Sequence, residues 1–259
     1  MPANSTNPSV LITGGTRGLG LALAQSFLRR GHRVVVCSRS PEAVERVQRE
    51  VPELHAFQAD VSLYEERAKL IDKCEERIGH VGILVNNAAL CRVQDFLRAD
   101  RSVEAEIATN FTAPVEMCRA LLAKPPSARP HAIVNISTGG AFIPLTRLPI
   151  YSATKAALHS FSQTLRHQLK PHGIKVIEVF PPTMDTELIK EIELAGPRPQ
   201  DAKVIAGFAD RTVAGVLAGK EVIVADLATA AALRLARIAP RAMAALANKA
   251  IRVRAEASP

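Results

Sequence analysis

The chain has 259 residues, enough to bury a large core in one α/β domain, and its formal net charge is +8. The basic residues are dispersed, and a chain with no tryptophan and two tyrosines offers little for base stacking, which argues against nucleic-acid binding. Apolar stretches are too short to span a membrane, and no secretion signal is evident at the start of the chain. The four cysteines lack the paired spacing of metal ligands, so we expect a cytoplasmic protein with no metal site.

Short β-rich segments alternate along the chain with helical patterns, which is typical of repeated βαβ units and a parallel sheet. Seven such segments predict a single-domain, doubly wound α/β fold with a seven-stranded parallel sheet flanked by helices. Ligands of this architecture bind at the C-terminal ends of the strands. The predicted strands cover residues 10–13, 33–37, 55–59, 83–86, 132–136, 175–180 and 221–224.

The first predicted strand runs into a glycine-rich turn, Thr13-Gly14-Gly15-Thr16-Arg17-Gly18-Leu19-Gly20, which leads into an expected helix over residues 19–30. A strand, a glycine-rich turn and a helix in this order let the backbone approach a pyrophosphate at the helix N-terminus. An ordinary βα turn is the alternative interpretation. The position of the turn and the Tyr/Lys pair described below favour nucleotide binding.

The end of the second predicted strand bears on the choice of nucleotide. Proteins of this fold that prefer NAD place a carboxylate there to bind the ribose 2′-hydroxyl, whereas an arginine accommodates the 2′-phosphate of NADP. Here the strand continues into Ser38-Arg39 without an acidic residue, and Arg17 supplies a second guanidinium. Two guanidinium groups suit a phosphate dianion, so we expect NADP(H); the alternative is that both arginines are merely solvated.

Tyr151 and Lys155 stand four residues apart at the start of a predicted helix, so their side chains lie on one helical face. An ammonium beside a phenol favours the phenolate and lowers a pKa that is about 10 in model peptides. Such a tyrosine can exchange a proton with a carbonyl or alcohol oxygen. Taken alone, the spacing is also found between solvated surface neighbours.

Together these features resemble the short-chain dehydrogenase/reductase family, whose signatures are Thr-Gly-x-x-x-Gly-x-Gly and a later Tyr-x-x-x-Lys. The resemblance extends from residue 9 to residue 226 and implies a Rossmann fold with an NADP-binding catalytic domain over residues 1–226. Further matches, in chain order, are Asp60-Val61, Asn86-Asn87-Ala88-Ala89, Asn110 and Pro181-Pro182-Thr183-Met184-Asp185-Thr186.

The resemblance also implies roles for individual residues. Tyr151 is the acid/base, Lys155 lowers its pKa and binds the nicotinamide ribose, and Asn110 holds a water in a proton relay. Asp60 accepts from the adenine amino group, with a plain strand-end aspartate as the alternative; for Asn110 the alternative is a core or capping amide. The implied cofactor contacts are Gly14, Thr16, Arg17, Gly18, Leu19, Gly20, Ser38, Arg39, Asp60, Val61, Asn87, Ala88, Ala89, Tyr151, Lys155, Pro181, Met184 and Thr186.

Three positions depart from the family pattern. The family's catalytic serine is replaced by Thr138, which follows Ser137, and the threonine methyl stiffens χ1 and crowds the site. We expect Thr138 to orient the substrate carbonyl, with Ser137 as the alternative. Pro182 replaces a glycine after the sixth strand, and Ala89 replaces a glycine after the fourth. Because of Pro182 and the run Ser-Ala-Thr-Lys-Ala-Ala-Leu-His-Ser that follows Tyr151, the chain resembles a bacterial subgroup of DltE-like oxidoreductases.

Residues 227–259 form a C-terminal extension in which the family resemblance fades. Residues 228–239 and 241–254 are rich in alanine, leucine and arginine, and Pro240 between them should break or kink a helix. Packing on the domain or in a homodimer or homotetramer is the favoured interpretation, because alanine offers little bulk for a membrane. Peripheral contact with an anionic membrane is the alternative.

The expected substrate is an apolar alcohol or ketone, and the expected reaction interconverts a secondary alcohol and the corresponding ketone. The expected pocket wall is apolar, although core packing would also explain about half of its members. A non-catalytic NADP(H)-binding regulator is the competing hypothesis, and the presence of both Tyr151 and Lys155 argues against it. The wall residues are Leu90, Cys91, Phe142, Ile143, Leu145, Met184 and Leu188.

Overall fold

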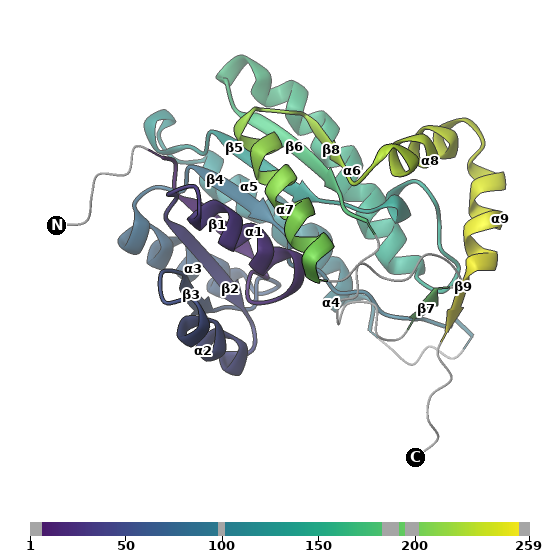
Figure 1. Cartoon of the computed structure of the whole chain (residues 1–259), viewed down its shortest axis with the longest axis horizontal. Helices are drawn as coiled ribbons and strands as arrows, with labels where there is room; N and C mark the ends of the chain where they lie inside the picture. Colours follow the sequence, from purple (N-terminus) through teal and green to yellow (C-terminus); the bar gives the residue numbers. More distant parts are fainter. Residues whose placement is uncertain (1–6, 98–101, 183–191, 195–201, 254–259) are drawn as a thin grey trace.

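The computed structural model describes residues 7–97, 102–182, 192–194 and 202–253 of the chain. Its centre is a parallel sheet of seven strands in the order β3-β2-β1-β4-β5-β6-β8 (Figure 1). All seven predicted strands are confirmed, and their ends agree within one residue. The strands are β1 (Val10–Thr13), β2 (Val34–Ser38), β3 (His55–Gln58), β4 (Ile83–Asn86), β5 (Ala132–Ile136), β6 (Lys175–Phe180) and β8 (Val222–Val224).

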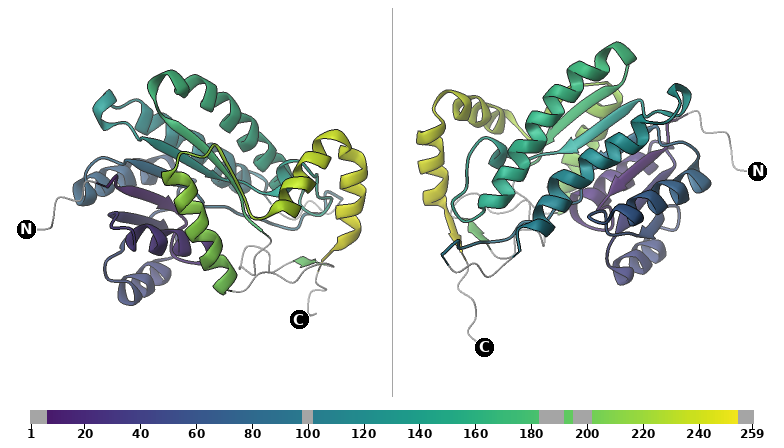
Figure 2. Two further views of the ribbon diagram at one scale, coloured as in Figure 1. Left: turned by 45° about the horizontal axis from the view of Figure 1, so that its top comes forward. Right: turned by 180° about the vertical axis from the view of Figure 1, so that it is seen from behind.

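Helices cover both faces of the sheet (Figure 2). Successive strand residues point to opposite faces, so Val10 and Ile12 join one apolar core while Leu11 joins the other. The doubly wound α/β fold is therefore confirmed. The first core is closed by α1 (Gly18–Leu28), α2 (Pro41–Glu50) and α7 (Ala202–Leu217), and the second by α3 (Tyr64–Ile78), α5 (Ala113–Leu122) and α6 (Pro149–Leu169).

The strand order reverses at β1, which lies between β2 and β4. Val10 is in register with Val34 on one side and Ile83 on the other. The crossovers from β1 and β4 leave in opposite directions, and such a switch point opens a crevice at the carboxyl ends of the strands. Thr13 ends β1 and Asn86 ends β4, so the glycine-rich turn and the Asn-Asn-Ala-Ala motif meet there.

The C-terminal extension differs from the expectation at its end. Helix α8 (Leu227–Ile238) is capped by Asp226, whose carboxylate accepts from the backbone N–H of Thr229, and α9 (Pro240–Ala250) begins at the proline that was expected to interrupt the helix. The second helix stops at Ala250. Residues Ile251–Val253 form strand β9, paired antiparallel with β7 (Ile192–Leu194), which the sequence patterns did not predict. Two β-branched residues in three favour an extended segment there.

Shorter elements complete the described chain. Helix α4 (Glu104–Ile107) continues into a π-helical turn over Ala108–Thr112 and then into α5. Turns of 3₁₀ helix lie at Pro126–Ala128, Gly139–Ala141 and Lys170–His172. The second of these connects β5 to the loop before α6, so it belongs to the carboxyl edge of the sheet.

Candidate active site

The glycine-rich turn after β1 is built so that no side chain fits at its tightest points. Gly14 has φ +65°, and a Cβ there would lie 2.9 Å from the Cα of Ala88. A Cβ on Gly20 would clash with the carbonyl oxygen of Gly14 and lie 2.6 Å from the side-chain nitrogen of Asn87. The turn therefore presents bare backbone beside the first turn of α1, which is the form that a pyrophosphate site requires.

Thr13 ties this turn to the segment after β4. Its hydroxyl oxygen accepts from the backbone N–H groups of Asn87 and Ala88, each at 3.0 Å. The Asn87 side chain in turn donates to the carbonyl oxygens of Thr13 and Gly14, each at 2.9 Å. Thr13 was not among the predicted site residues, although it is the threonine that opens the glycine motif. Ala89 follows this clamped segment and is half-buried.

Three guanidinium groups gather beside the turn. Burial lowers the pKa of Arg17, and the positive charges of Arg39 and Arg46 lower it further. Arg46 lies on α2 and donates a hydrogen bond of 3.1 Å to the carbonyl oxygen of Thr16, which is itself buried. Arg46 was missed from the sequence, because nothing in its spacing says that α2 returns it to the glycine turn. Cations that destabilise one another are suited to a polyanionic ligand.

The residues that follow β2 and β3 form the outer side of this end of the sheet. Ser38 accepts from the backbone N–H of Ser40 at 3.3 Å. A carboxylate oxygen of Asp60 accepts from both the backbone N–H and the hydroxyl of Ser62, at 2.9 and 2.7 Å. Val61 is buried, and its carbonyl accepts from Arg67 at 2.6 Å. Asp60 is thus held in a local turn while its side chain stays half-exposed.

Tyr151 and Lys155 lie one turn apart near the start of α6, and both side chains are buried, at 8% and 3% exposure. The ammonium of Lys155 is 5.8 Å from the centroid of the Tyr151 ring and donates a hydrogen bond of 2.8 Å to the carbonyl oxygen of Ile136. Both therefore lie at the carboxyl end of β5.

The expectation of a lowered Tyr151 pKa needs correction for this structure. Burial raises the pKa of the Tyr151 phenol above its ordinary value, Cys91 and Glu106 raise it further, and a hydrogen bond with Thr138 works in the opposite direction. Burial also lowers the pKa of Lys155 to about 8, against the attraction of Cys91 and Glu178. For each of the two groups, the cost of removing the charged form from water is the largest effect on the pKa.

The hydroxyls of Thr138 and Ser137 lie in different surroundings, as expected for successive residues of an extended segment. The Thr138 hydroxyl lies close enough to the Tyr151 phenol to favour the phenolate through a hydrogen bond, and it also accepts from the backbone N–H of Gly140 at 3.4 Å. Ser137 is buried, and its hydroxyl has no hydrogen-bond partner among the described residues. Of the two hydroxyls, the one on Thr138 faces the tyrosine.

Asn110 lies in the π-helical turn and is fully buried. Its side-chain oxygen accepts from the backbone N–H of Leu90 at 2.7 Å, while its nitrogen donates to the carbonyl oxygen of Leu90 at 2.8 Å and to the hydroxyl of Thr154 at 3.2 Å. This geometry matches the alternative of a core amide that fixes the segment after β4. A role in a proton relay stays a prediction.

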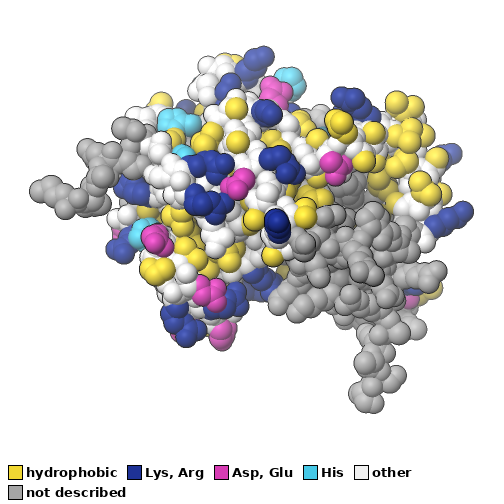
Figure 3. Space-filling model, viewed as in Figure 1, with side chains coloured by type: hydrophobic (Ala, Val, Ile, Leu, Met, Phe, Trp, Pro, Cys, Tyr) yellow, Lys and Arg dark blue, Asp and Glu magenta, His cyan; other side chains and the backbone are white. Residues whose placement is uncertain are grey.

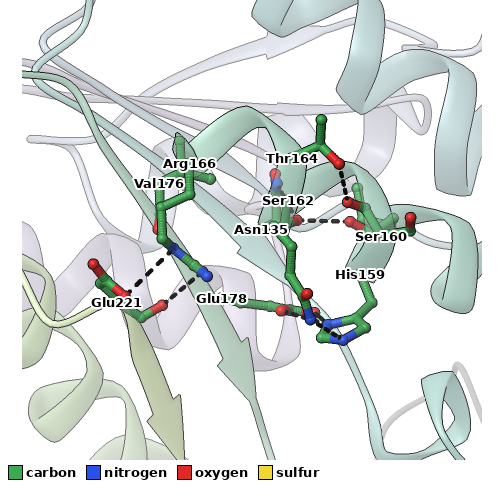
Figure 4. Close-up of polar contacts among 11 residues, drawn as sticks. Asn135, His159, Ser160, Ser162, Thr164, Arg166, Val176, Glu178 and Glu221 are labelled. Atoms are coloured by element: carbon green, nitrogen blue, oxygen red, sulfur yellow. Dashed lines mark hydrogen bonds and ion pairs between the residues drawn. The ribbon is translucent and has the colours of Figure 1, made fainter. Parts of the chain in front are cut away.

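A second polar network, which sequence reasoning missed, lies between α6 and the sheet (Figure 4). Glu178 on β6 is buried, and its two oxygens lie 2.7 and 2.9 Å from Nδ1 of His159, one helical turn after Lys155. The Asn135 side chain donates to Ser162 at 2.8 Å and accepts from Asn86 at 2.8 Å. A charged residue in a central strand was the available signal, because an isolated carboxylate is not buried without a partner.

The predicted pocket wall divides into two parts. Cys91 and Leu145 pack against a small apolar cluster made by Tyr151 and Leu148. Phe142 instead packs edge-on against His159 and at a tilt against Phe180, with ring centroids 4.4 and 5.6 Å apart. Pro181 and Pro182 are half-buried after β6. Three predicted residues, Met184, Thr186 and Leu188, lie outside the described residues.

Comparison with known proteins relates this arrangement to one family. The sequence profile of the short chain dehydrogenase family matches residues 8–195. The uncharacterized oxidoreductase DltE of Bacillus subtilis is 41% identical over 189 residues, which cover 71% of this chain and 74% of that protein. L-xylulose reductase of Homo sapiens is 30% identical over 184 residues, covering 69% of this chain and 72% of the other.

Solved structures show the same likeness over nearly the whole chain. A short chain dehydrogenase from Burkholderia cenocepacia in complex with NADP has a TM-score of 0.76 at 25% identity, covering 93% of this chain and 97% of that one. A short-chain dehydrogenase from Sphingobium yanoikuyae in complex with NADPH has a TM-score of 0.75 at 28% identity, covering 97% of this chain and 99% of the other.

Proposed function

Because the chain belongs to the short-chain dehydrogenase family of oxidoreductases, we propose that it interconverts a secondary alcohol and a ketone on an apolar small molecule with NADP(H). One observation carries the proposal. A buried tyrosine and a buried lysine lie one helical turn apart at the carboxyl edge of the sheet, and the hydroxyl of Thr138 lies beside the phenol.

The residues at the switch point fit an NADP molecule. The side-chain-free turn at Gly14 and Gly20 leaves room for a pyrophosphate, and Arg17, Arg39 and Arg46 supply charge for a 2′-phosphate. Two solved relatives of the same fold were crystallised with NADP or NADPH, which supports the assignment. When bound, the nicotinamide supplies or accepts the hydride, so the protein contributes positioning and proton transfer.

Tyr151 is the proton donor in the direction of ketone reduction. Its raised pKa keeps the phenol protonated at neutral pH, so a proton is available for the oxygen that becomes the alcohol. The Thr138 hydroxyl donates to the same carbonyl oxygen and orients it. Lys155 binds the nicotinamide ribose, and its charge stabilises the phenolate once the proton has left. Protonation of the Tyr151 phenolate then restores the site for the next turnover.

An apolar substrate is inferred from the side chains next to the phenol. Leu148 forms an apolar cluster with Tyr151, and Leu145, Val93 and Cys91 pack against it. A phosphorylated substrate would need cationic partners at that place, because a buried charge without a partner is costly. DltE of Bacillus subtilis is an uncharacterized oxidoreductase, so the substrate class is inferred from this wall.

The direct test is NADPH consumption by the purified protein over a panel of aliphatic, aromatic and polycyclic ketones, with NADP⁺ and the matching alcohols in the reverse direction. We expect turnover with apolar members of the panel and a preference for NADPH over NADH. Tight binding of NADPH with no turnover on any member would contradict catalysis and leave a cofactor-binding regulator.

A further inference from the structure

The two helices of the C-terminal extension turn an apolar stripe away from the protein. On α8, Leu227 is 88% exposed and Ile238 is 81% exposed, and on α9 Leu246 is 64% exposed. Leu227, Leu235 and Ile238 are eight and three residues apart, so they lie along one side of α8. The opposite side of α8 carries Leu233 and Ala236, which are buried. The extension therefore packs on the protein by one side and leaves the other open.

The charge of this segment has one sign. Between residues 227 and 253 the chain has no aspartate or glutamate, and the exposed carboxylate that precedes Leu227 belongs to the helix cap Asp226. Arg234 lies on the stripe of α8, and Arg241 and Lys249 are exposed on α9. Figure 3 shows the apolar side chains at the α8–α9 end of the molecule with Lys and Arg at their border. The basic residues of the segment are Arg234, Arg237, Arg241, Lys249 and Arg252.

The extension is fixed to the loop that leads to the catalytic helix. The side-chain oxygen of Asn248 accepts from the backbone N–H and the hydroxyl of Thr146, at 2.6 and 2.7 Å, and its nitrogen donates to the carbonyl oxygen of Pro144 at 3.0 Å. The Arg237 guanidinium lies 4.9 Å from the centroid of the Phe142 ring. These contacts hold the extension, whose helices α8 and α9 lie together at one end of the molecule (Figure 1), against the loop that precedes α6.

We propose that the exposed faces of α8 and α9 dock on an anionic lipid bilayer. Leucine and isoleucine side chains insert at the boundary of headgroups and acyl chains, while the flanking cations bind anionic headgroups. The contact is peripheral, since no helix in the described part of the chain is long and apolar enough to cross a membrane.

The charged and apolar side chains of this face argue against two other binding partners, a second copy of the chain and a nucleic acid. In a symmetric dimer built on this face, the cations of one copy would meet the same cations of the other, and the described part of the extension has no carboxylate after its cap Asp226 to pair them. A nucleic acid would match the cations but would leave Leu227 and Ile238 without a role. An anionic membrane satisfies both the apolar and the basic side chains.

Docking would also bring the loop beside Tyr151 close to the bilayer. An apolar ketone or alcohol partitions into lipid, so such a substrate could reach the site without crossing bulk water. This route for the substrate rests on the proposed function, whereas the docking of the protein on the bilayer does not.

Cosedimentation of the full-length protein with phosphatidylglycerol/phosphatidylcholine vesicles tests the docking without any turnover. We expect binding at low salt that weakens at high salt, and little binding to pure phosphatidylcholine. Loss of one cation should lower the partition coefficient about fivefold, so the double variant Arg234→Gln/Arg241→Gln should lower it more than tenfold. Leu227→Ser/Ile238→Ser should lower it at least as much.

Matched substitutions elsewhere separate this face from general charge and hydrophobicity. Leu63→Ser and Arg49→Gln alter an exposed leucine and an exposed arginine far from the extension in the sequence, and both should leave vesicle binding unchanged. NADPH affinity should be the same in all variants, which shows that they fold. No binding to anionic vesicles, equal binding to neutral ones, or equal loss in the Leu63 and Arg49 variants would overturn the proposal. Self-association abolished by Leu227→Ser/Ile238→Ser, without vesicle binding, would assign the face to a second copy.

Discussion

The Nζ atom of Lys155 lies 5.8 Å from the centroid of the Tyr151 ring, and its ammonium donates a hydrogen bond to the carbonyl oxygen of Ile136. Burial raises the pKa of the phenol and lowers that of the ammonium to about 8. The site thus keeps its proton donor protonated while holding the lysine near the point of losing its charge.

A first prediction concerns stability against pH. The pKa of Lys155 is about 8 in the fold and about 10.4 in the unfolded chain, so the burial penalty applies fully below pH 8 and disappears as the pH rises toward 10.4. Lys155→Met should therefore be more stable than wild type at pH 7, by up to about 3 kcal/mol less the lost bond to Ile136. The advantage should vanish near pH 10.4.

Urea unfolding of both proteins at pH 7 and at pH 10 measures that difference. Lys155→Arg is the control, because it keeps a positive charge at both values of pH. A stability difference between Lys155→Met and wild type that does not shrink at the higher pH would contradict a lowered lysine pKa.

A second prediction separates the two neighbouring hydroxyls. Thr138→Val keeps the shape and removes the donor beside Tyr151, so kcat should fall by about one to three orders of magnitude, as for loss of an oxyanion donor. Thr138→Ser should keep or raise activity, because it relieves the crowding by the methyl group. Ser137→Ala should be nearly neutral for kcat. Steady-state kinetics with one ketone checks all three, and an inactive Ser137→Ala beside a fully active Thr138→Val would reverse the assignment.

A third prediction concerns cofactor choice. Arg39→Ala and Arg46→Ala should each weaken NADPH binding by about tenfold or more and leave NADH binding nearly unchanged, because a charge-assisted pair contributes about 1.5–3 kcal/mol. Arg49→Ala, on the same helix as Arg46, is the matched control. Fluorescence titration with both cofactors measures the ratio. Equal losses for NADPH and NADH would show that the arginines do not bind the 2′-phosphate.

A fourth prediction uses the four thiols. Burial raises the pKa of Cys37, Cys74 and Cys118 to about 12, so these thiols should resist alkylation at pH 8. Cys91 is half-buried and packs beside Tyr151, so it should react first and its modification should block turnover. Mass spectrometry after brief iodoacetamide treatment, with and without NADPH and with Cys91→Ser as control, identifies the site. Modification of a buried thiol before Cys91 would contradict this order.

The fold could be predicted from the sequence because each strand is a short apolar run between turn signals, and burial on both faces leaves little choice of element. The β7–β9 pair could not, since three-residue strands carry too little pattern to separate them from a loop or a helix end. Register within the parallel sheet likewise needs contacts between segments distant in the chain.

The candidate site was predictable where local spacing determines geometry, as for Tyr151 and Lys155 on one helical turn. Contacts made across the fold were not. Arg46 reaches the glycine turn from another helix, and Glu178 meets His159 between a strand and a helix. The predicted lowering of the Tyr151 pKa was wrong for the same reason. Spacing shows the neighbouring charge but not the depth of burial, and burial is the largest effect on this pKa.

The variant Tyr151→Phe, compared with wild type in NADPH affinity and in turnover of an accepted ketone, tests the phenol as proton donor. The substitution removes the phenolic proton and little binding surface. We predict a nearly unchanged dissociation constant for NADPH and a fall in kcat of about 10²–10⁴-fold, the usual contribution of a general acid. A variant that kept more than about a tenth of the wild-type rate would show that Tyr151 is not the proton donor.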